Sequence, residues 1–450
     1  MNHVLNPEQT RALIAALGDA HKRVAAIYPG DRLDRQPVHT VYGGAQLFSH
    51  DIAVKLGKGS VRALEEYGGD PDTFANALGL EGDAAFRRTI HERVAAKLAR
   101  EAVEDFRIDF EDGYGNRLDD EEDAQAVTDA EEVAKGMKLG TLPPGIGIRV
   151  KPLTEELAPR ALRTLDRFIT TTVGAAGKLP NNFVVTLPKI TAVEQVAVMV
   201  DALDHLERAL SLQPRSIPIE LMVETPQSIF DWNGAVALPA LVTAGRGRVR
   251  GAHFGTYDYT AGCNITAAHQ QPQHPACDFA RHVMQVSLAG TGVTISDGAT
   301  TVMPVGPHRA AAGASLTPKQ VEENRAAVHH AWKVHFDDVR SSLRQAYYQG
   351  WDLHPAQLVT RYAAVFSFFL EGREQAGARL RAFMDKAAQA TLLGNVFDDA
   401  ATGQGLLNFF LRGINCGAFS EEDALATGLT YEELRLRSFV KILTRRRGLA

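Results

Sequence analysis

The sequence predicts an α/β protein built on a (β/α)8 barrel that spans residues 36–365. Apolar runs of strand length alternate with long amphipathic stretches through this part of the chain, as eight β-then-α units require. The chain has 450 residues, of which 45% are hydrophobic, so it is long enough for a large core. A doubly wound open sheet is the alternative, but no glycine-rich GxGxxG turn follows an early strand.

The expected elements follow the alternation of hydrophobic and turn-forming residues. Residues 1–35 have a polar, helical pattern, which predicts an N-terminal helical arm ahead of the barrel. The expected helices between strands include Ala84–Ala102, Pro159–Thr172, Ala192–Leu210 and Cys277–Ser287. The eight expected strands are Pro37–Tyr42, Asp105–Phe110, Ile146–Val150, Phe183–Pro188, Ile217–Val223, Val249–Phe254, Gly292–Ile295 and Trp351–Leu353.

The last part of the chain, residues 366–450, is predominantly helical in pattern. Leu370–Ala388 and Glu421–Leu443 both carry amphipathic spacing. We expect a C-terminal helical extension that caps the barrel rather than an independent domain.

Composition excludes several classes of protein. Lys and Arg number 48 against 54 Asp and Glu, a net charge of −6 that gives no support for a nucleic-acid partner. No apolar run approaches the roughly 18 residues of a membrane span, and no basic, apolar leader opens the chain, so a cytoplasmic protein is expected. Cys263, Cys277 and Cys416 are odd in number and widely spaced, which argues against a disulfide framework or a zinc site.

Two carboxylates close apolar runs. Glu224 follows the strand Ile217–Val223, and Asp258 follows Val249–Phe254. An acid at the end of a buried strand is costly to desolvate without a counter-charge. Two of them on successive strands predict a shared hard cation, and Mg²⁺ prefers such oxygen ligands. Active sites of barrel enzymes lie at this end of the strands.

The second and third strands end in further charged residues. Asp109, Glu111 and Asp112 continue an apolar strand, which favours a site over a solvated surface. Arg149 is embedded in the third strand, where a cation needs an anionic partner. Its planar fork suits the carboxylate of a substrate, although a structural pairing with Asp109 or Glu111 is the alternative.

Other strand ends offer residues that we expect to bind substrate. Lys189 follows the fourth strand as a second cation, unless it only extends to solvent. Gly255 and Thr256 loosen the approach to Asp258. His354 follows the eighth strand and either shapes the pocket or has a structural role. A metal flanked by carboxylates with an Arg opposite suits a 2-oxo acid, because the metal stabilises the enolate formed when a C–C bond breaks or forms.

In these motifs the chain resembles the superfamily of citrate lyase beta subunits, malyl-CoA lyases and malate synthases. The resemblance implies that Glu224 and Asp258 bind Mg²⁺, that Arg149 binds the carboxylate of the 2-oxo acid, and that the Asp109–Asp112 cluster orders metal-bound water or neighbouring side chains. The stretch Asp119–Gly140 is expected to be an insertion outside the shared core. The motifs, in order, are Asp109-Phe-Glu-Asp112, Ile148-Arg-Val150, Leu187-Pro-Lys-Ile190, Met222-Val-Glu-Thr-Pro226, Phe254-Gly-Thr-Tyr-Asp-Tyr259 and Gly350-Trp-Asp-Leu-His-Pro-Ala-Gln357.

A further segment, Phe397-Asp-Asp-Ala-Ala-Thr402, resembles the Met-Glu-Asp-Ala-Ala-Thr segment of malate synthases. By that match Asp399 is the base that removes a methyl proton from acetyl-CoA, brought over the barrel mouth by the helical cap. The alternative is an ordinary helix N-cap.

Three functions are compatible with these features. The first is a Mg²⁺-dependent lyase or condensing enzyme acting on a 2-oxo acid of the glyoxylate, pyruvate or oxaloacetate type, with an acyl-CoA partner. The second is a CoA-independent class II aldolase of 2-oxo acids. The third is a non-catalytic barrel that binds a metabolite. The resemblance also implies a homo-oligomer.

Overall fold

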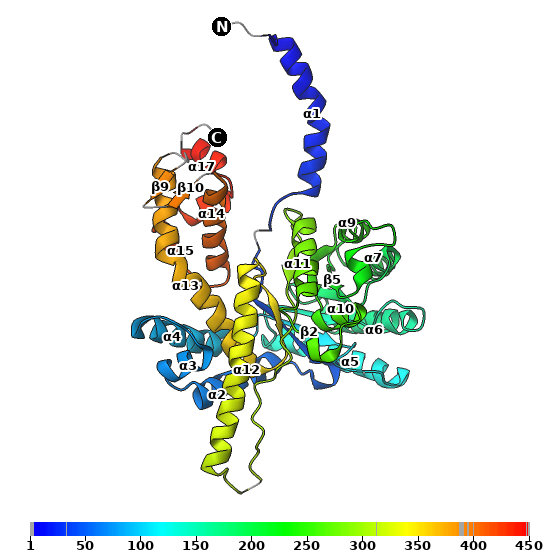
Figure 1. Ribbon diagram of the computed structural model, residues 1–450. Coiled ribbons are helices and arrows are strands. Elements are labelled where there is room, and N and C mark those ends of the chain that lie inside the picture. The colour runs from blue at the N-terminus through cyan, green and yellow to red at the C-terminus, as the bar shows by residue number, and fades with distance from the viewer. Residues whose placement is uncertain are drawn as a thin grey trace.

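The predicted (β/α)8 barrel is confirmed. A computed structural model describes residues 4–32, 34–311, 313–386, 391–393, 396–398, 400–446 and 448. Eight parallel strands form one sheet in the order β7-β6-β5-β4-β3-β2-β1-β8, ringed by helices (Figure 1). The strands are β1 His39–Gly44, β2 Asp105–Asp109, β3 Gly145–Arg149, β4 Phe183–Leu187, β5 Ile219–Val223, β6 Val249–Phe254, β7 Thr294–Ser296 and β8 Gly350–Asp352.

The ring closes through an irregular segment that follows β7. The N–H of Asp297 donates to the carbonyl of Gln349 at 2.9 Å, and Ala299 forms an isolated parallel bridge with Trp351. On its other side β8 pairs with β1 in regular parallel register. The barrel is therefore nearly closed, and the carboxyl ends of its strands meet on one face.

The helices that follow the strands form the outer layer of the barrel. The stretch Asp119–Gly140 is not an insertion outside the core. It forms the helix between β2 and β3, which ends where Gly140 adopts a left-handed φ of 67°. The barrel helices are α2 Ile52–Tyr67, α3 Pro71–Leu78, α4 Ala84–Glu101, α5 Asp119–Leu139, α6 Ala158–Ala176, α7 Val193–Ala209, α8 Pro226–Ile229, α9 Leu238–Ala244, α10 Thr256–Gly262, α11 Pro275–Leu288, α12 Pro318–Arg344 and α13 Pro355–Asp385, with short 3-10 turns at Ala45–Leu47 and Ala267–His269.

Charged and polar side chains occupy the interior of the barrel. Arg107 on β2 donates across the barrel to both carboxylate oxygens of Glu220 on β5, at 3.0 and 2.6 Å, and also pairs with Asp105. Tyr42 on β1 reaches His253 on β6 at 3.2 Å. Partners on strands that are not neighbours can meet only inside the ring. Alternate residues of each strand therefore point inward, as strand geometry requires.

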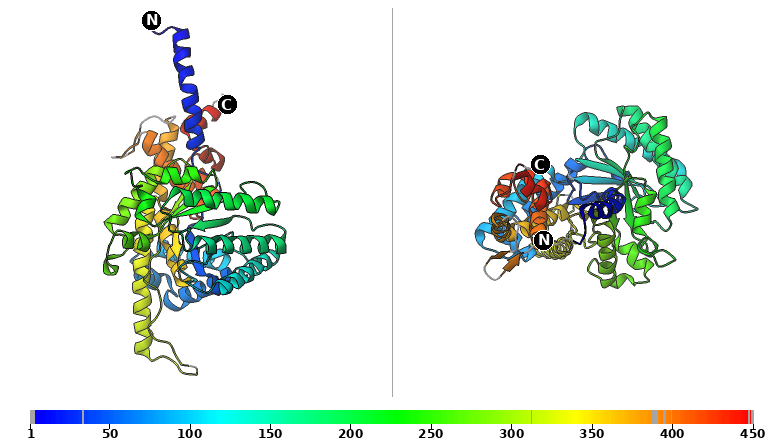
Figure 2. Two further views of the ribbon diagram at one scale, coloured as in Figure 1. Left: turned by 90° about the vertical axis from the view of Figure 1, so that its right-hand side faces the viewer. Right: turned by 90° about the horizontal axis from the view of Figure 1, so that it is seen from above.

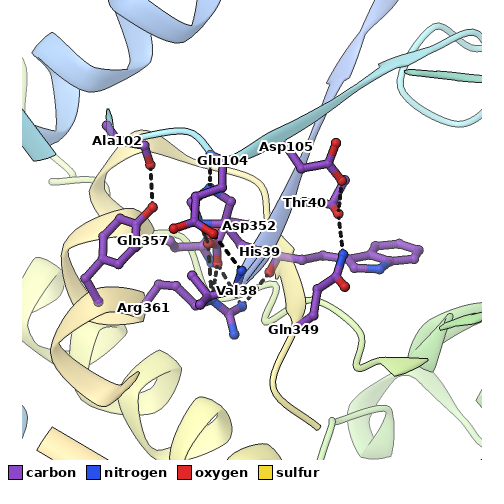
Figure 3. A network of polar contacts seen from close by, with 12 residues as sticks. Val38, His39, Thr40, Ala102, Glu104, Asp105, Gln349, Asp352, Gln357 and Arg361 are labelled. Carbon is purple, nitrogen blue, oxygen red and sulfur yellow. Dashed lines mark hydrogen bonds and ion pairs between the residues drawn. The ribbon is translucent and has the colours of Figure 1, made fainter. Parts of the chain in front are cut away.

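A second buried network joins β8 to β1 and β2 (Figure 3). Nδ1 of His39 lies 3.1 Å from Asp352, and Nε2 of the same ring accepts the N–H of Glu104 at 3.0 Å. Arg361 of α13 donates to Asp352 at 2.9 Å. His335 of α12 contacts the same carboxylate at 3.0 Å. These contacts hold α12 and α13 against the closing strand and keep the pKa of Asp352 well below its usual range, although burial alone would raise it.

The two ends of the chain lie on the same side of the barrel (Figures 1 and 2). Helix α1, Pro7–Ile27, projects from the body with no buried residue. Beyond α13 the region is mainly helical, and Glu421–Leu443 is divided among three short helices. Residues Thr391–Leu393 (β9) and Val396–Asp398 (β10) pair as antiparallel strands. The C-terminal helices are α14 Ala400–Asn415, α15 Glu421–Leu425, α16 Tyr431–Arg435 and α17 Phe439–Arg446.

The C-terminal helices contact the segment that precedes β1. Arg412 of α14 donates to Gln36 at 2.7 Å, and Arg437 pairs with Asp31 at 2.9 Å. Asp31 and Gln36 come before the first strand, so the described part of the C-terminal extension lies near the amino ends of the strands. Of the described helices, none is both long and apolar enough to cross a membrane.

Candidate active site at the carboxyl ends of the strands

An ion pair between β2 and β3 forms the floor of the site. Asp109 and Arg149 are neighbours in the parallel register of these strands. Nε and Nη2 of Arg149 donate to the two oxygens of Asp109 at 2.7 and 2.5 Å, a bidentate pairing that is buried on both sides. Burial alone would lower the pKa of Arg149, but Asp109 and Glu111 raise it well above its usual range. Arg149 is therefore fixed as a cation with Nη1 directed away from Asp109.

The loop after β2 is held by buried hydrogen bonds. The backbone N–H groups of Glu111 and Gly113 donate to Asp109 at 3.0 and 2.8 Å. From β3, Nζ of Lys151 donates to the carbonyls of Phe110 and Gly115 at 2.7 and 3.0 Å. The loop is thereby clamped from both ends, and its carboxylates face the centre of the barrel mouth.

Lys189 lies among the carboxylates of the site. Its backbone has a left-handed φ of 48°, which turns its N–H toward Glu224 at 2.7 Å. Its ammonium group pairs with Glu111, and it lies 3.2 Å from Asp112 and 3.5 Å from Asp258. Of the two expected alternatives, a second cation or a side chain that only extends to solvent, the geometry fits the first: Lys189 is a cation that links the ends of β2, β4 and β6.

 

Glu224 and Gly255 meet at the ends of β5 and β6. A side chain on Gly255 would place its Cβ 2.5 Å from Cβ of Glu224 and 2.6 Å from Oε2, so only glycine leaves room for this carboxylate. Thr256, the next residue, is buried, and its hydroxyl oxygen has no hydrogen-bond partner among the described residues. Asp258 follows on the first turn of α10 with its side chain 40% exposed. One acid of the pair is therefore enclosed, while the other opens to solvent.

Two carboxyl groups in the site titrate near neutrality. Burial raises the pKa of Glu224 to about 7, with Arg149 opposing the rise and Asp258 adding to it. Burial also raises the pKa of Glu111 to about 7, against the pull of Arg149 and Lys189. Groups of this kind, whose pKa lies near the working pH, are suited to proton transfer.

The site carries more acids than cations. Asp109, Glu111, Asp112, Glu224 and Asp258 make five carboxyl groups, against the two cations Arg149 and Lys189. Within the described ranges, no group of three or more His, Cys, Asp or Glu side chains is arranged to hold a metal ion by itself. A pair of carboxylates is nevertheless a donor set that suits Mg²⁺, which keeps several water or substrate ligands. The excess of acids fits an added cation.

His354 serves first as a helix cap. Its Nδ1 accepts the backbone N–H of Ala356 at 3.2 Å at the start of α13, and burial lowers the pKa of the ring.

Two aromatic residues that had no role in the sequence analysis lie against Arg149. The guanidinium carbon is 5.1 Å from the ring centre of Tyr42 and 6.0 Å from that of Trp351. The sequence signal that could have identified them is an aromatic residue at an inward-facing position of β1 and of β8.

Asp399 lies outside the described residues, so its role as a base stays a prediction. The neighbouring helix α14 begins at Ala400 and makes its contacts with the barrel near the amino ends of the strands, through Arg412 and Asn415. The site at the carboxyl ends of β2–β6 thus has no described contact with α14.

Similarity to solved structures agrees with this barrel. The fold is similar to that of a citrate lyase from Burkholderia xenovorans, with a TM-score of 0.52 and 20% identity, covering 78% of this chain and 94% of that one. A malate synthase from Haloferax volcanii, in a complex with magnesium and glyoxylate, matches with a TM-score of 0.45 and 15% identity over 92% of this chain and 99% of that one. The protein CitE from Mycobacterium tuberculosis, in complex with magnesium, acetoacetate and coenzyme A, matches with a TM-score of 0.44 and 14% identity over 84% and 97%.

The barrel of this chain is therefore similar in fold to that of the citrate lyase from Burkholderia xenovorans. The sequence matches the family described as a domain of unknown function, DUF6986, over residues 17–442, and the chain belongs to that family. No curated protein matches the sequence.

Proposed function

We propose that the protein is a Mg²⁺-dependent enzyme that cleaves or forms a carbon–carbon bond of a 2-oxo acid, with an acyl-CoA as the second reactant. The observation that carries the proposal is the convergence of five carboxyl groups and two cations at the carboxyl ends of β2–β6. Glu224 and Asp258 would hold the metal, which when bound supplies a Lewis acid for the keto oxygen.

The chain's own residues would bind the substrate and move the proton. Arg149 has two nitrogens engaged by Asp109, while Nη1 lies 3.3 Å from Glu111. Protonation of Glu111, whose pKa is about 7, weakens its hold on Nη1 and leaves that nitrogen to a substrate carboxylate. The same carboxyl group can hold or release a proton at neutral pH. Lys189 would balance the charge of the acids around the substrate.

One experiment tests the acyl-CoA reaction. The full-length protein is incubated with Mg²⁺, glyoxylate and a panel of acyl-CoA thioesters, and release of free CoA thiol is followed. We expect release that depends on both Mg²⁺ and glyoxylate and that is lost in Glu224→Gln. Absence of turnover across the panel contradicts the CoA part of the proposal.

A CoA-independent aldolase is the second candidate. The described helices α14–α17 make their barrel contacts near the amino ends of the strands, so no described helix of that region covers the site. Pyruvate methyl protons are followed by NMR in D₂O with Mg²⁺ and no CoA. Exchange that disappears in Glu224→Gln supports the aldolase. Mg²⁺-dependent binding of 2-oxo acids with neither exchange nor turnover indicates a barrel that only binds a metabolite.

A further inference from the structure

A basic groove lies on the face of the barrel opposite the candidate active site. It has a volume of about 460 Å³ and is formed by the loops that lead into β4, β5 and β6. No acidic residue lines it, although the chain as a whole has a net charge of −6. The basic groove is lined by the cations Arg32, Lys178, Arg215, Arg248 and Arg250, together with uncharged residues of the same loops.

Two of the five cations are neutralised by carboxylates behind the groove. Arg248 is buried and pairs with Glu207 at 2.6 Å, and also with Asp204. Arg32 donates twice to Asp34, at 2.8 Å in each case. These pairs form part of the wall and leave no net charge for a ligand.

Of the other three cations, the side chains of Lys178 and Arg215 have no carboxylate within ion-pair distance among the described residues. Arg250 forms a long ion pair, at 4.0 Å, with Asp34, the carboxylate that Arg32 also binds. Nη1 of Arg215 lies 3.9 Å from the place where a Cβ on Gly247 would be, so its guanidinium group lies over the loop that enters β6. Two unpaired cations, and a third that shares its carboxylate with Arg32, therefore lie on one concave surface.

The position of Arg250 is set by an irregularity in the sheet. Ile219 pairs with Val249, and Glu220 pairs with Gly251, so Arg250 is an extra residue on β6 without a partner on β5. Such a bulge redirects a side chain, and bulges recur beside binding sites. Burial lowers the pKa of Arg250 and the nearby cation Arg32 lowers it further, while Asp34 partly opposes the shift. An anion in the groove would favour the charged form of Arg250.

We propose that the basic groove binds a small molecule bearing a phosphate or diphosphate group. The five cations outnumber their three carboxylate partners, Asp34, Asp204 and Glu207, by two, which matches a ligand with two negative charges. The guanidinium groups of Arg215 and Arg250 suit phosphate oxygens. The apolar residues of the lining leave room for an organic portion of the ligand. The negative net charge of the chain and the pocket-sized volume of the groove favour a small phosphate compound over a nucleic acid. The site is independent of the metal and of the proposed reaction, because it opens on the other face of the barrel.

Calorimetry with inorganic pyrophosphate tests this site. Pyrophosphate is titrated into the full-length protein without Mg²⁺ at low ionic strength, and we expect saturable binding. The double variant Arg215→Gln/Arg250→Gln should bind at least about tenfold more weakly, or about 1.4 kcal/mol. The double variant Arg62→Gln/Arg88→Gln removes the same charge from exposed positions on α2 and α4 and should bind as the unaltered protein does.

Three results would overturn the proposal: no saturable binding of phosphate or pyrophosphate, equal weakening in both double variants, or tighter binding of a single-stranded oligonucleotide that depends on the same two arginines. Circular dichroism and Tm show whether each variant is folded. If Arg215→Gln/Arg250→Gln does not fold, Lys178→Gln takes its place, since Lys178 is exposed and substitution there should not disturb the core.

Discussion

At the scale of single residues, the candidate site depends on how far each acid is buried and which cation faces it. Asp109 is neutralised by Arg149 at 2.5 Å. Glu224 is just as buried, yet no side-chain cation pairs with it among the described residues, and its pKa rises to about 7. The sequence predicted that both would lie at strand ends. It offered Asp109 or Glu111 as a partner of Arg149 but did not decide between a structural pair and a substrate-binding role, because the partner of an acid depends on neighbouring strands.

The raised pKa of Glu224 predicts that Mg²⁺ affinity depends on pH. The metal binds the ionised carboxylate, so below pH 7 binding must displace a proton from Glu224. We expect affinity to rise by up to about tenfold per pH unit below pH 7 and to level off above it. Calorimetry in two buffers of different ionisation enthalpy measures the protons released. Affinity that is constant from pH 5.5 to 8.5 contradicts this expectation.

At the scale of elements, strands were easier to predict than the C-terminal helices. β2 begins at Asp105 as expected, because its alternation of apolar and charged residues is typical of a strand. The stretch Glu421–Leu443 kept its amphipathic spacing but forms separate helices. Thr430 caps a new helix by accepting the N–H of Glu433 at 3.2 Å, and Gly428 adopts a left-handed φ of 80° before it. Local capping therefore overrode the longer periodicity.

The clamp on the loop after β2 predicts a stability effect. Nζ of Lys151 pairs with the fully buried Glu122 of α5 at 3.1 Å as well as with the loop carbonyls. Lys151→Met removes the nearer cation from buried Glu122, which keeps Arg160 at 3.8 Å and the hydroxyl of Thr164 at 2.6 Å. The substitution should cost up to about 3–5 kcal/mol of unfolding free energy. Urea denaturation measures it. The double variant Lys151→Met/Glu122→Gln should recover part of the unfolding free energy that Lys151→Met loses. If the double variant is no more stable than Lys151→Met, the result counts against the ion pair.

The raised pKa of Asp129 on α5 predicts that Asp129→Asn stabilises the protein by an amount that grows with pH. Burial raises its pKa to about 8, only partly offset by the hydrogen bond from Gln125. The folded state therefore keeps a proton that the unfolded state releases near pH 4. Stability from this group is complete below pH 4 and declines as pH rises toward 8. Asp129→Asn should thus gain stability relative to the unaltered protein by up to about 1.4 kcal/mol per pH unit over this window. Urea denaturation at pH 5 and pH 8 tests this. If the variant and the unaltered protein differ in unfolding free energy by the same amount at both pH values, the expectation is contradicted.

At the scale of the whole molecule, the barrel is nearly closed around a charged interior. The fold class was predictable, because eight alternating units leave few other arrangements. The pairing of Arg107 with Glu220 was not, because strand periodicity shows which residues share a face and not which strands lie opposite each other in the ring. Sequence periodicity likewise does not show where the C-terminal helices lie on the barrel. They were expected over the barrel mouth, but their described contacts lie near the amino ends of the strands.

The charged interior predicts that the barrel is sensitive to loss of one central cation. Arg107 faces Asp105 and Glu220, and both carboxylates are buried. Arg107→Met leaves two buried acids without this partner and should cost about 3–5 kcal/mol. Arg62→Met, on the exposed face of α2, should change stability by less than about 0.5 kcal/mol. Similar urea midpoints for the two variants would show that the interior pairs contribute little.

The central claim is that Glu224 and Asp258 form a Mg²⁺ site that holds a 2-oxo acid. Calorimetric titration of Mg²⁺ into the full-length protein, with and without glyoxylate, tests it most directly. We expect Mg²⁺ binding that tightens in the presence of glyoxylate, and loss of that binding in Glu224→Gln and in Asp258→Asn, while both variants keep the unaltered Tm within a few degrees. Unchanged Mg²⁺ binding in both folded variants would contradict the account.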